Sequence, residues 1–155
     1  MTIKDSGTRR KFPTGAVRDI QEGKGRCDLM PLGVLGDWMK SPFLRALARF
    51  QDTQNPFTLR TAFYDLVKEV FNGDFETASL EVSKHFEEGA KKYGENNWQK
   101  GIPLNCYIDS AVRHYLKWRR GDFDEPHDRA ALWNVLCCAW EADREGLKNE
   151  QTEKA

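Results

Sequence analysis

The chain has 155 residues, with 24 Lys and Arg against 24 Asp and Glu, so its formal net charge is zero. This length fits one domain, and a neutral chain has no overall field for nucleic acid, so we expect no direct DNA binding. No apolar run approaches the roughly 18 residues that a membrane span needs, and the N-terminus shows no apolar leader. We therefore expect no membrane association and a cytoplasmic location, in the host cytoplasm if a phage encodes the chain.

The cysteine and histidine content restricts the metal chemistry. The chain has four cysteines, without any CxxC pair, and three histidines that are not closely spaced with them. This pattern predicts free thiols and argues against a zinc site. We therefore expect that any metal would be a hard cation held by carboxylates.

The first 30 residues are basic and rich in glycine, with seven Lys and Arg against four acids. Composition alone favours a solvated tail. However, three glycines interleave with Arg18, Lys24 and Arg26, which would let backbone amides and cations approach a phosphate. Both interpretations stay open. Because the segment has few apolar groups, we expect removal of residues 1–28 to weaken substrate binding and to leave folding nearly unchanged.

The rest of the chain has the spacing of helices. Ser41 and Asn55 each precede a proline, an arrangement typical of a capped helix start. Together with the apolar spacing, these signals predict helices that begin at Pro42 and Pro56, and further helices over 75–92, from Pro103 to Gly121 and from Pro126 to Gly146. We find no alternating strand pattern, so we predict an all-α fold with a charged, frayed tail from Lys148.

Polar groups at the borders of two predicted helices are candidates for chemistry. His85, Glu88 and Lys92 follow one flank of the helix over 75–92, although an ordinary amphipathic edge with ion pairs would look the same. Asp109 and Arg113, four residues apart, fit either a cation and phosphate site or a surface salt bridge. Both alternatives stay open for each of the two sets.

The segment over 121–128 holds four acids and His127 within eight residues, at the start of the last predicted helix. Capping a helix needs only one acid, so the excess favours a magnesium site. Asn134 follows seven residues after His127 among apolar side chains, where an amide needs a hydrogen-bond partner.

Several short motifs occur together in the order and spacing of a known family. They are Gly-Ala-Val-Arg-Asp at 15–19, Gly-Arg-Cys-Asp-Leu-Met-Pro at 25–31, Gly-Ala-Lys-Lys-Tyr-Gly at 89–94, Asn-Trp at 97–98, Lys-Gly at 100–101, Tyr-Ile-Asp-Ser-Ala at 107–111, Arg-His at 113–114, His127, and Trp-Asn at 133–134. With these motifs the chain resembles the dATP/dGTP diphosphohydrolase (MazZ-like) family, which is related to the MazG-type all-α nucleotide pyrophosphatases.

The resemblance implies a MazG-like helical bundle that cleaves a purine deoxynucleoside triphosphate, dATP or dGTP, to the monophosphate and pyrophosphate with Mg²⁺ or Mn²⁺. It divides one domain into an irregular substrate-binding segment (1–35), an inserted helical pair (36–77), a core bundle (78–146) and a tail (147–155). The inserted pair would either cap the substrate pocket or form an oligomer contact. We expect a homo-oligomer.

The resemblance also implies roles for individual residues. The expected catalytic residues are Asp109, Glu88 and His127. The expected metal ligands are Asp109, Asp124, Glu88, Glu125 and Asp128. The expected substrate-binding residues are Arg18, Lys24, Arg26, Lys91, Lys92, Asn97, Trp98, Arg113, His114 and Asn134. The alternative is a non-catalytic helical module, of phage origin, that binds nucleotide or a partner protein.

Overall fold

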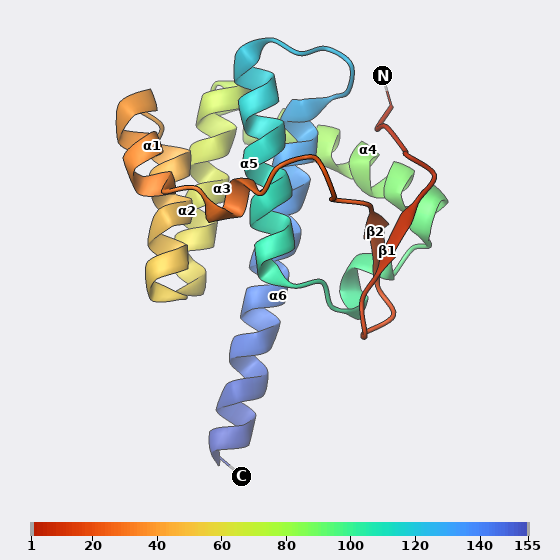
Figure 1. Cartoon of the computed structure of the whole chain (residues 1–155). Helices are drawn as coiled ribbons and strands as arrows, with labels where there is room; N and C mark the ends of the chain where they lie inside the picture. Colours follow the sequence, from red (N-terminus) through yellow and green to blue (C-terminus); the bar gives the residue numbers. More distant parts are fainter. Residues whose placement is uncertain (1, 155) are drawn as a thin grey trace.

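The computed structural model describes the backbone of residues 2–154 and the side chains of residues 2–146, and it is a helical bundle (Figure 1). Its α-helices are α1 (Leu32–Met39), α2 (Pro42–Thr53), α3 (Pro56–Phe71), α4 (Phe75–Tyr93), α5 (Leu104–Arg120) and α6 (His127–Lys154). Two short 3-10 helices, η1 (Cys27–Leu29) and η2 (Asn97–Lys100), and two strands, β1 (Arg9–Lys11) and β2 (Val17–Asp19), complete it. The predicted all-α class is confirmed. None of the helices described is long and apolar enough to span a membrane.

The central pair of helices is α5 and α6, which pack along each other. Helices α3 and α4 both pack on α6, α2 packs on α3, and α1 packs on α2. Figure 1 therefore shows α1, α2 and α3 on one side of the central pair, and α4 with the two strands on the other side. The N-terminal segment crosses α5 between these two sides, so it lies beside the helices that carry most of the predicted site residues.

The predicted capping residues begin their helices as expected. The side chain of Ser41 accepts a hydrogen bond from the Leu44 amide, and that of Asn55 accepts one from the Phe57 amide. Each satisfies an amide that the first helical turn leaves without an intrahelical partner. The starts of α2 and α3 were therefore readable from local sequence.

The structure also contains two short strands, for which the sequence shows no alternating pattern. β1 and β2 pair antiparallel, with Arg9 opposite Asp19, and Gly15 has a positive φ of 90° in the turn between them. Each strand has only three residues, and most of these are charged. Strands so short carry no run of alternating apolar residues from which a strand is recognised.

The helices also differ from prediction at two places. Helix α1 begins at Leu32, inside the segment predicted as irregular, so three helices precede α4 instead of two. It packs closely on α2, and Gly36 permits this close contact. A Cβ at Gly36 would lie only 3.0 Å from the Arg45 backbone nitrogen. Helix α6 does not end at Gly146 but runs on to Lys154. The tail from Lys148 was predicted to be frayed. The side chains of this tail lie outside the described residues.

A buried polar network holds the inserted helices on the core. The Tyr115 hydroxyl of α5 lies 2.7 Å from Ser41 Oγ, at the start of α2, and it donates to Glu69 of α3. Burial, followed by the Glu69 carboxylate, raises the pKa of Tyr115 to about 12. The inserted region is therefore fixed to α5 by hydrogen bonds as well as by apolar packing.

The N-terminal segment is part of the folded core. Phe12 and Ala16, which flank the turn of the hairpin, are 7% and 0% exposed. The backbone amide of Cys27 donates to Asp109 of α5 at 2.6 Å. These contacts correct the expectation that residues 1–28 serve binding alone, and we now expect their removal to destabilise the protein.

Candidate functional site

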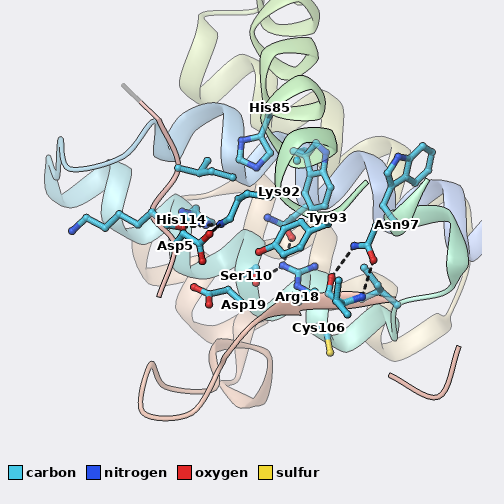
Figure 2. A pocket seen from close by; sticks show the side chains of 18 of the residues that line it. Asp5, Arg18, Asp19, His85, Lys92, Tyr93, Asn97, Cys106, Ser110 and His114 are labelled. Carbon is cyan, nitrogen blue, oxygen red and sulfur yellow. Dashed lines mark hydrogen bonds and ion pairs between the residues drawn. The ribbon is translucent and has the colours of Figure 1, made fainter. Parts of the chain in front are cut away.

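A cavity of about 430 Å³ lies between the N-terminal segment and helices α4, α5 and α6. Its lining includes residues 3–6 and 17–21 of the N-terminal segment, and side chains from α4, η2, α5 and the first turns of α6 (Figure 2). No lining residue comes from residues 36–77. The inserted helices therefore do not cap this cavity, which leaves the oligomer contact as their expected role.

Arg18 of β2 lies in the wall of the cavity. Its Nη2 donates to Ser110 Oγ at 2.9 Å and to Asn134 Oδ1 at 3.0 Å. The guanidinium lies over the Tyr107 and Trp133 rings, 5.3 Å and 5.9 Å from their centroids. Its Nη1 is buried and has no hydrogen-bond partner in the described part of the chain. Because a buried donor without a partner costs about 1–3 kcal/mol, this atom is suited to an acceptor on a bound ligand.

Aromatic side chains form another part of the wall. Phe86 of α4 lies 5.5 Å from Trp98 and 5.8 Å from Trp133, measured between ring centroids. His85 packs beside Trp133, and Figure 2 shows it extending from α4 near Lys92 and Tyr93. Trp133 Nε1 and His85 Nδ1 are buried without a hydrogen-bond partner among the described residues. Flat apolar faces beside free polar atoms suit a heteroaromatic base.

Burial also fixes the charge of His85. Loss of solvation, followed by the positive charge of Arg129, lowers the pKa of His85 to about 4, although Glu88 acts in the opposite direction. The imidazole is therefore neutral at neutral pH. It adds no charge to the cavity.

Cationic side chains from the N-terminal segment, α4 and α5 reach the same cavity. They are Lys4, Arg10, Arg18, Lys24, Lys92, Arg113 and Lys117. Lys92 donates to the Lys4 carbonyl at 3.1 Å, and Lys24 lies 3.4 Å from an Asp19 oxygen. Lys117 has no ion-pair partner in the described part of the chain. Such a set of cations is suited to a polyanion such as a triphosphate.

Asp109 is buried and fully engaged in protein contacts. It is 3% exposed, and its Oδ2 lies 2.6 Å from Arg113 Nη2. Its Oδ1 accepts the hydrogen bond from the Cys27 amide. The Asp109–Arg113 pair is thus neither a surface salt bridge nor an open metal ligand, because both carboxylate oxygens already hold donors of the chain.

Asp124, His127 and His114 form a hydrogen-bonded row at one edge of the cavity. His127 Nε2 lies 2.7 Å from Asp124 Oδ1, and His127 Nδ1 lies 2.9 Å from His114 Nδ1. Lys4 and His127 hold the pKa of the Asp124 carboxyl well below its usual range. Burial, followed by the neighbouring His127, holds the pKa of His114 well below its usual range, so His114 is neutral at neutral pH.

Asn97 holds the hairpin over the cavity and uses both ends of its amide to do so. Its Oδ1 accepts from the Val17 amide, and its Nδ2 donates to the Val17 carbonyl, both at 2.7 Å. Figure 2 shows these two bonds beside Arg18. Asn97 therefore positions β2, which in turn places Arg18.

The structure brings most of the predicted residues together, but not all of them. Asp109, Asp124, Glu125, Arg18, Lys24, Lys92, Asn97, Trp98, Arg113, His114 and Asn134 line the cavity. Glu88 and Asp128 line a different, shallower hollow, where Glu88 accepts from Arg129 at 2.5 Å. Arg26 pairs with Asp28, and Lys91 is exposed beside Glu87. His127 lies behind His114 and reaches the cavity only through it.

The five predicted metal ligands do not form one all-carboxylate group among the described residues. Two groups of three have ligand atoms within 4.8 Å of one another, and each contains a histidine: His114 with Glu125 and His127, and Asp122 with Asp124 and His127. Asp109, Glu88 and Asp128 belong to neither group. The arrangement of carboxylate oxygens that Mg²⁺ prefers is therefore not formed as expected.

Three residues of α5 were not predicted from the sequence. Ser110 and Lys117 line the cavity, and the Tyr107 ring lies under the Arg18 guanidinium. A signal existed, because Ser110, His114 and Lys117 repeat at four and three residues and so share one helix face. Lys4 and Asp5 also line the cavity. No spacing rule connects them to α5, so their position was not readable.

Comparison with known protein families gives one match. A family model described as "dATP/dGTP diphosphohydrolase, N-terminal" matches residues 61–151, which is more than half of the chain. The matched range contains α4, α5 and most of α6, which supply three walls of the cavity. No curated protein and no solved structure gives a match.

Proposed function

Because the chain belongs to the dATP/dGTP diphosphohydrolase family, we propose that it hydrolyses a purine deoxynucleoside triphosphate to the monophosphate and pyrophosphate. The observation that carries the proposal is the joint lining of one cavity by an aromatic wall and by cations. A nucleotide has a flat base and a polyanionic tail, and both need partners in the same site. The cavity volume of about 430 Å³ lies in the usual range for small-molecule sites.

We assign binding roles to the chain's own residues. Arg18 offers its unpaired Nη1 to a phosphate oxygen, and its contacts with Ser110 and Asn134 hold the guanidinium in place before substrate arrives. Lys92 and Lys117 add positive charge along the same cavity. These cations stabilise the negative charge that develops as the bond between the α and β phosphates breaks.

The carboxylate of Glu125, which lines the cavity, is the group to orient the attacking water and accept its proton, whereas Asp124 is held by Lys4 and His127. We assign His127 a positioning role, because it contacts Asp124 and His114 and does not line the cavity. A bound Mg²⁺ or Mn²⁺ would neutralise phosphate charge and lower the pKa of water. Of the predicted ligands in the cavity, Glu125 keeps one carboxylate oxygen without a donor from the described residues, whereas both oxygens of Asp109 and of Asp124 hold donors.

The proposal is tested by incubating the full chain with the canonical nucleoside triphosphates and deoxynucleoside triphosphates, with Mg²⁺ or Mn²⁺, in water enriched in ¹⁸O. We expect pyrophosphate from dATP or dGTP, with the heavy oxygen in the monophosphate, because attack at the α phosphate places it there. Chelation should stop the reaction. Release of orthophosphate alone would indicate a phosphatase and contradict the proposal.

Arg18→Gln provides a matched variant for the same assay. Loss of a charge-assisted hydrogen bond to phosphate should raise KM by roughly 10- to 100-fold. Arg60→Gln is the control, because Arg60 is exposed and pairs with Asp143 away from the cavity. Equal KM values for Arg18→Gln and the unchanged protein would remove Arg18 from the phosphate site.

A second candidate is a module that binds nucleotide or a partner protein without hydrolysis. It is favoured by the ion pairs of the cavity, since Asp109 is held by Arg113 and Asp124 by Lys4. The family description also refers to the N-terminal part of the enzymes. Tight binding of dATP or dGTP by calorimetry, with no turnover of any nucleotide, would select this candidate.

A further inference from the structure

We infer that His114, Glu125 and His127 form a binding site for a transition-metal dication, of the Mn²⁺, Co²⁺ or Zn²⁺ class, at the edge of the cavity. The three residues come from α5, from the loop before α6 and from the first position of α6. One ligand atom of each lies within 4.8 Å of the others. The site differs from the all-carboxylate magnesium site that the sequence suggested.

The geometry of the two imidazoles is the first support. Their Nδ1 atoms are 2.9 Å apart. Two nitrogen ligands on one ion, each about 2.1 Å from it, would lie about 3.0 Å apart at right angles and about 3.4 Å apart in a tetrahedral site, so the two rings lie close to this range. A hydrogen bond between the rings would give the same separation, but it would not require a carboxylate beside both rings. Glu125, which is 9% exposed, supplies that carboxylate.

The contact between His127 and Asp124 is the second support. Asp124 Oδ1 lies 2.7 Å from His127 Nε2, so this nitrogen carries the proton. A ring that carries its single proton on Nε2 has its lone pair on Nδ1, and Nδ1 of His127 faces His114. A carboxylate that holds the far nitrogen of a ligating histidine is the usual outer partner in metal sites. Here Asp124 has that role.

The position of the site leaves room for a ligand. His114 and Glu125 both line the cavity, whereas His127 is 2% exposed behind them. Glu125 Oε1 accepts from the Lys4 amide at 2.8 Å, which leaves the other carboxylate oxygen for an ion. Three protein ligands on one side leave a position open towards the cavity, where water or a phosphate oxygen can bind.

The neighbouring group of Asp122, Asp124 and His127 is less suitable. Asp122 is held by Arg120, and Asp124 is held by Lys4 at 2.9 Å. Both carboxylates are therefore already neutralised by cations of the chain. His127 also uses Nε2 for Asp124, so the lone pair that remains points to His114.

The donor set decides which ion binds. Imidazole nitrogens suit first-row transition metals, whereas Mg²⁺ prefers oxygen ligands and keeps much of its water. The site should therefore bind Zn²⁺ more tightly than Co²⁺, and Co²⁺ more tightly than Mn²⁺, with Mg²⁺ weakest. A link between this ion and hydrolysis rests on the proposed function, but the metal site itself does not.

The test uses the full chain, stripped of metal and titrated with Co²⁺ in the absence of nucleotide. We expect one Co²⁺ per chain with a visible absorption spectrum that differs from that of the aqueous ion. Zn²⁺ should displace it, and a roughly hundredfold excess of Mg²⁺ should not. If the chain binds Co²⁺ in this way but hydrolyses no nucleotide, the proposed function is contradicted and the metal site is supported.

Three variants locate the site. His114→Ala and Glu125→Gln should remove the Co²⁺ spectrum, and Asp124→Asn should weaken binding by roughly 10- to 100-fold. The control is His85→Gln, because His85 is the third of the chain's three histidines and lies outside the group. Circular dichroism confirms that each variant folds. The inference is overturned if the unchanged chain gives only the spectrum of aqueous Co²⁺, or if Glu125→Gln and His114→Ala both keep the bound spectrum.

Discussion

Burial increases the loss of stability that follows when one charge of the Asp109–Arg113 ion pair is removed. The sequence allowed a surface salt bridge, yet the Asp109 and Arg113 side chains are only 4% and 11% exposed. A surface pair contributes little to stability, because water and salt screen it. A buried pair is different, since removing one charge leaves the other without compensation.

We therefore predict that Asp109→Asn lowers the free energy of unfolding by about 3 kcal/mol. The amide keeps an acceptor for Cys27 but no longer neutralises Arg113. Urea unfolding measures the change. Asp37→Asn is the matched control, because the Asp37 side chain is 71% exposed in its pair with Arg45, and its loss should cost less than about 1 kcal/mol. Equal effects of the two substitutions would show that the Asp109 pair behaves as a surface pair.

His85 predicts a pH dependence of stability. Its pKa is about 4 in the folded protein against 6.5 in the unfolded chain, because burial disfavours the charged ring. Between these values the unfolded state binds a proton that the folded state does not. Stability from this group is therefore complete above about pH 6.5 and falls as the pH drops towards 4, by up to about 3 kcal/mol.

The measurement compares urea unfolding of the unchanged protein and His85→Leu at pH 7 and pH 5. Leucine cannot titrate, so the loss of stability between the two pH values should be smaller in the variant by about 2 kcal/mol. The other two histidines are present in both proteins and cancel in the comparison. The same loss in both proteins would mean that His85 titrates normally when folded.

At the scale of elements, the hairpin is attached to the bundle through Asn97 of η2. Its two hydrogen bonds to Val17 act as a further rung beside β2. The same hairpin carries Arg18 into the cavity and Phe12 into the core. Loosening it should therefore affect binding and stability together.

We predict that Asn97→Ala lowers the free energy of unfolding by about 1–3 kcal/mol and accelerates hydrogen exchange of the Val17 amide. It should also raise KM, because Arg18 loses its fixed position. Hydrogen exchange by NMR and steady-state kinetics measure these effects. The neighbouring Asn96→Ala is the control, since Asn96 is exposed. Unchanged exchange at Val17 in Asn97→Ala would contradict the role of this contact.

At the scale of the whole molecule, α1 presents an apolar face to solvent. Trp38 is 79% exposed and Val34, one turn earlier on the same face, is 47% exposed. Leu29 of η1, shortly before α1, is 69% exposed. Large exposed apolar groups close together are typical of interaction surfaces. The homo-oligomer expected from sequence stays a prediction, and α1 is our candidate for its contact.

We predict that Trp38→Glu reduces the molar mass measured by light scattering to that of one chain, because a buried carboxylate would oppose the contact. Phe123→Glu is the control, since Phe123 is 83% exposed in the loop before α6. A monomeric unchanged protein would remove the prediction. An oligomer that persists in Trp38→Glu would place the contact on another surface.

The local sequence predicted the α-helices from α2 to α6, because their signals lie within a few residues of one another. Ser41 and Asn55 begin α2 and α3, and the apolar spacing over 75–92 gives α4 to within one residue. It also determined the family resemblance, since the motifs stand in fixed order along the chain. The short charged strands were missed, because they lack an apolar period of their own. Helix α1 was missed as a whole, although Leu32, Leu35 and Met39 have helical spacing, because Gly33 and Gly36 disfavour a helix.

Only the tertiary structure decided which of these residues meet. Arg18 and Asn134 are 116 positions apart and become hydrogen-bonded because the hairpin lies against α5 and α6. His114 and His127 face each other because α5 and α6 pack side by side, whereas Glu88 and Asp128 turn to another hollow. Contacts between distant segments depend on which helices pack together and at what angle. Residue spacing within one helix indicates its buried face, but not the helix that covers that face.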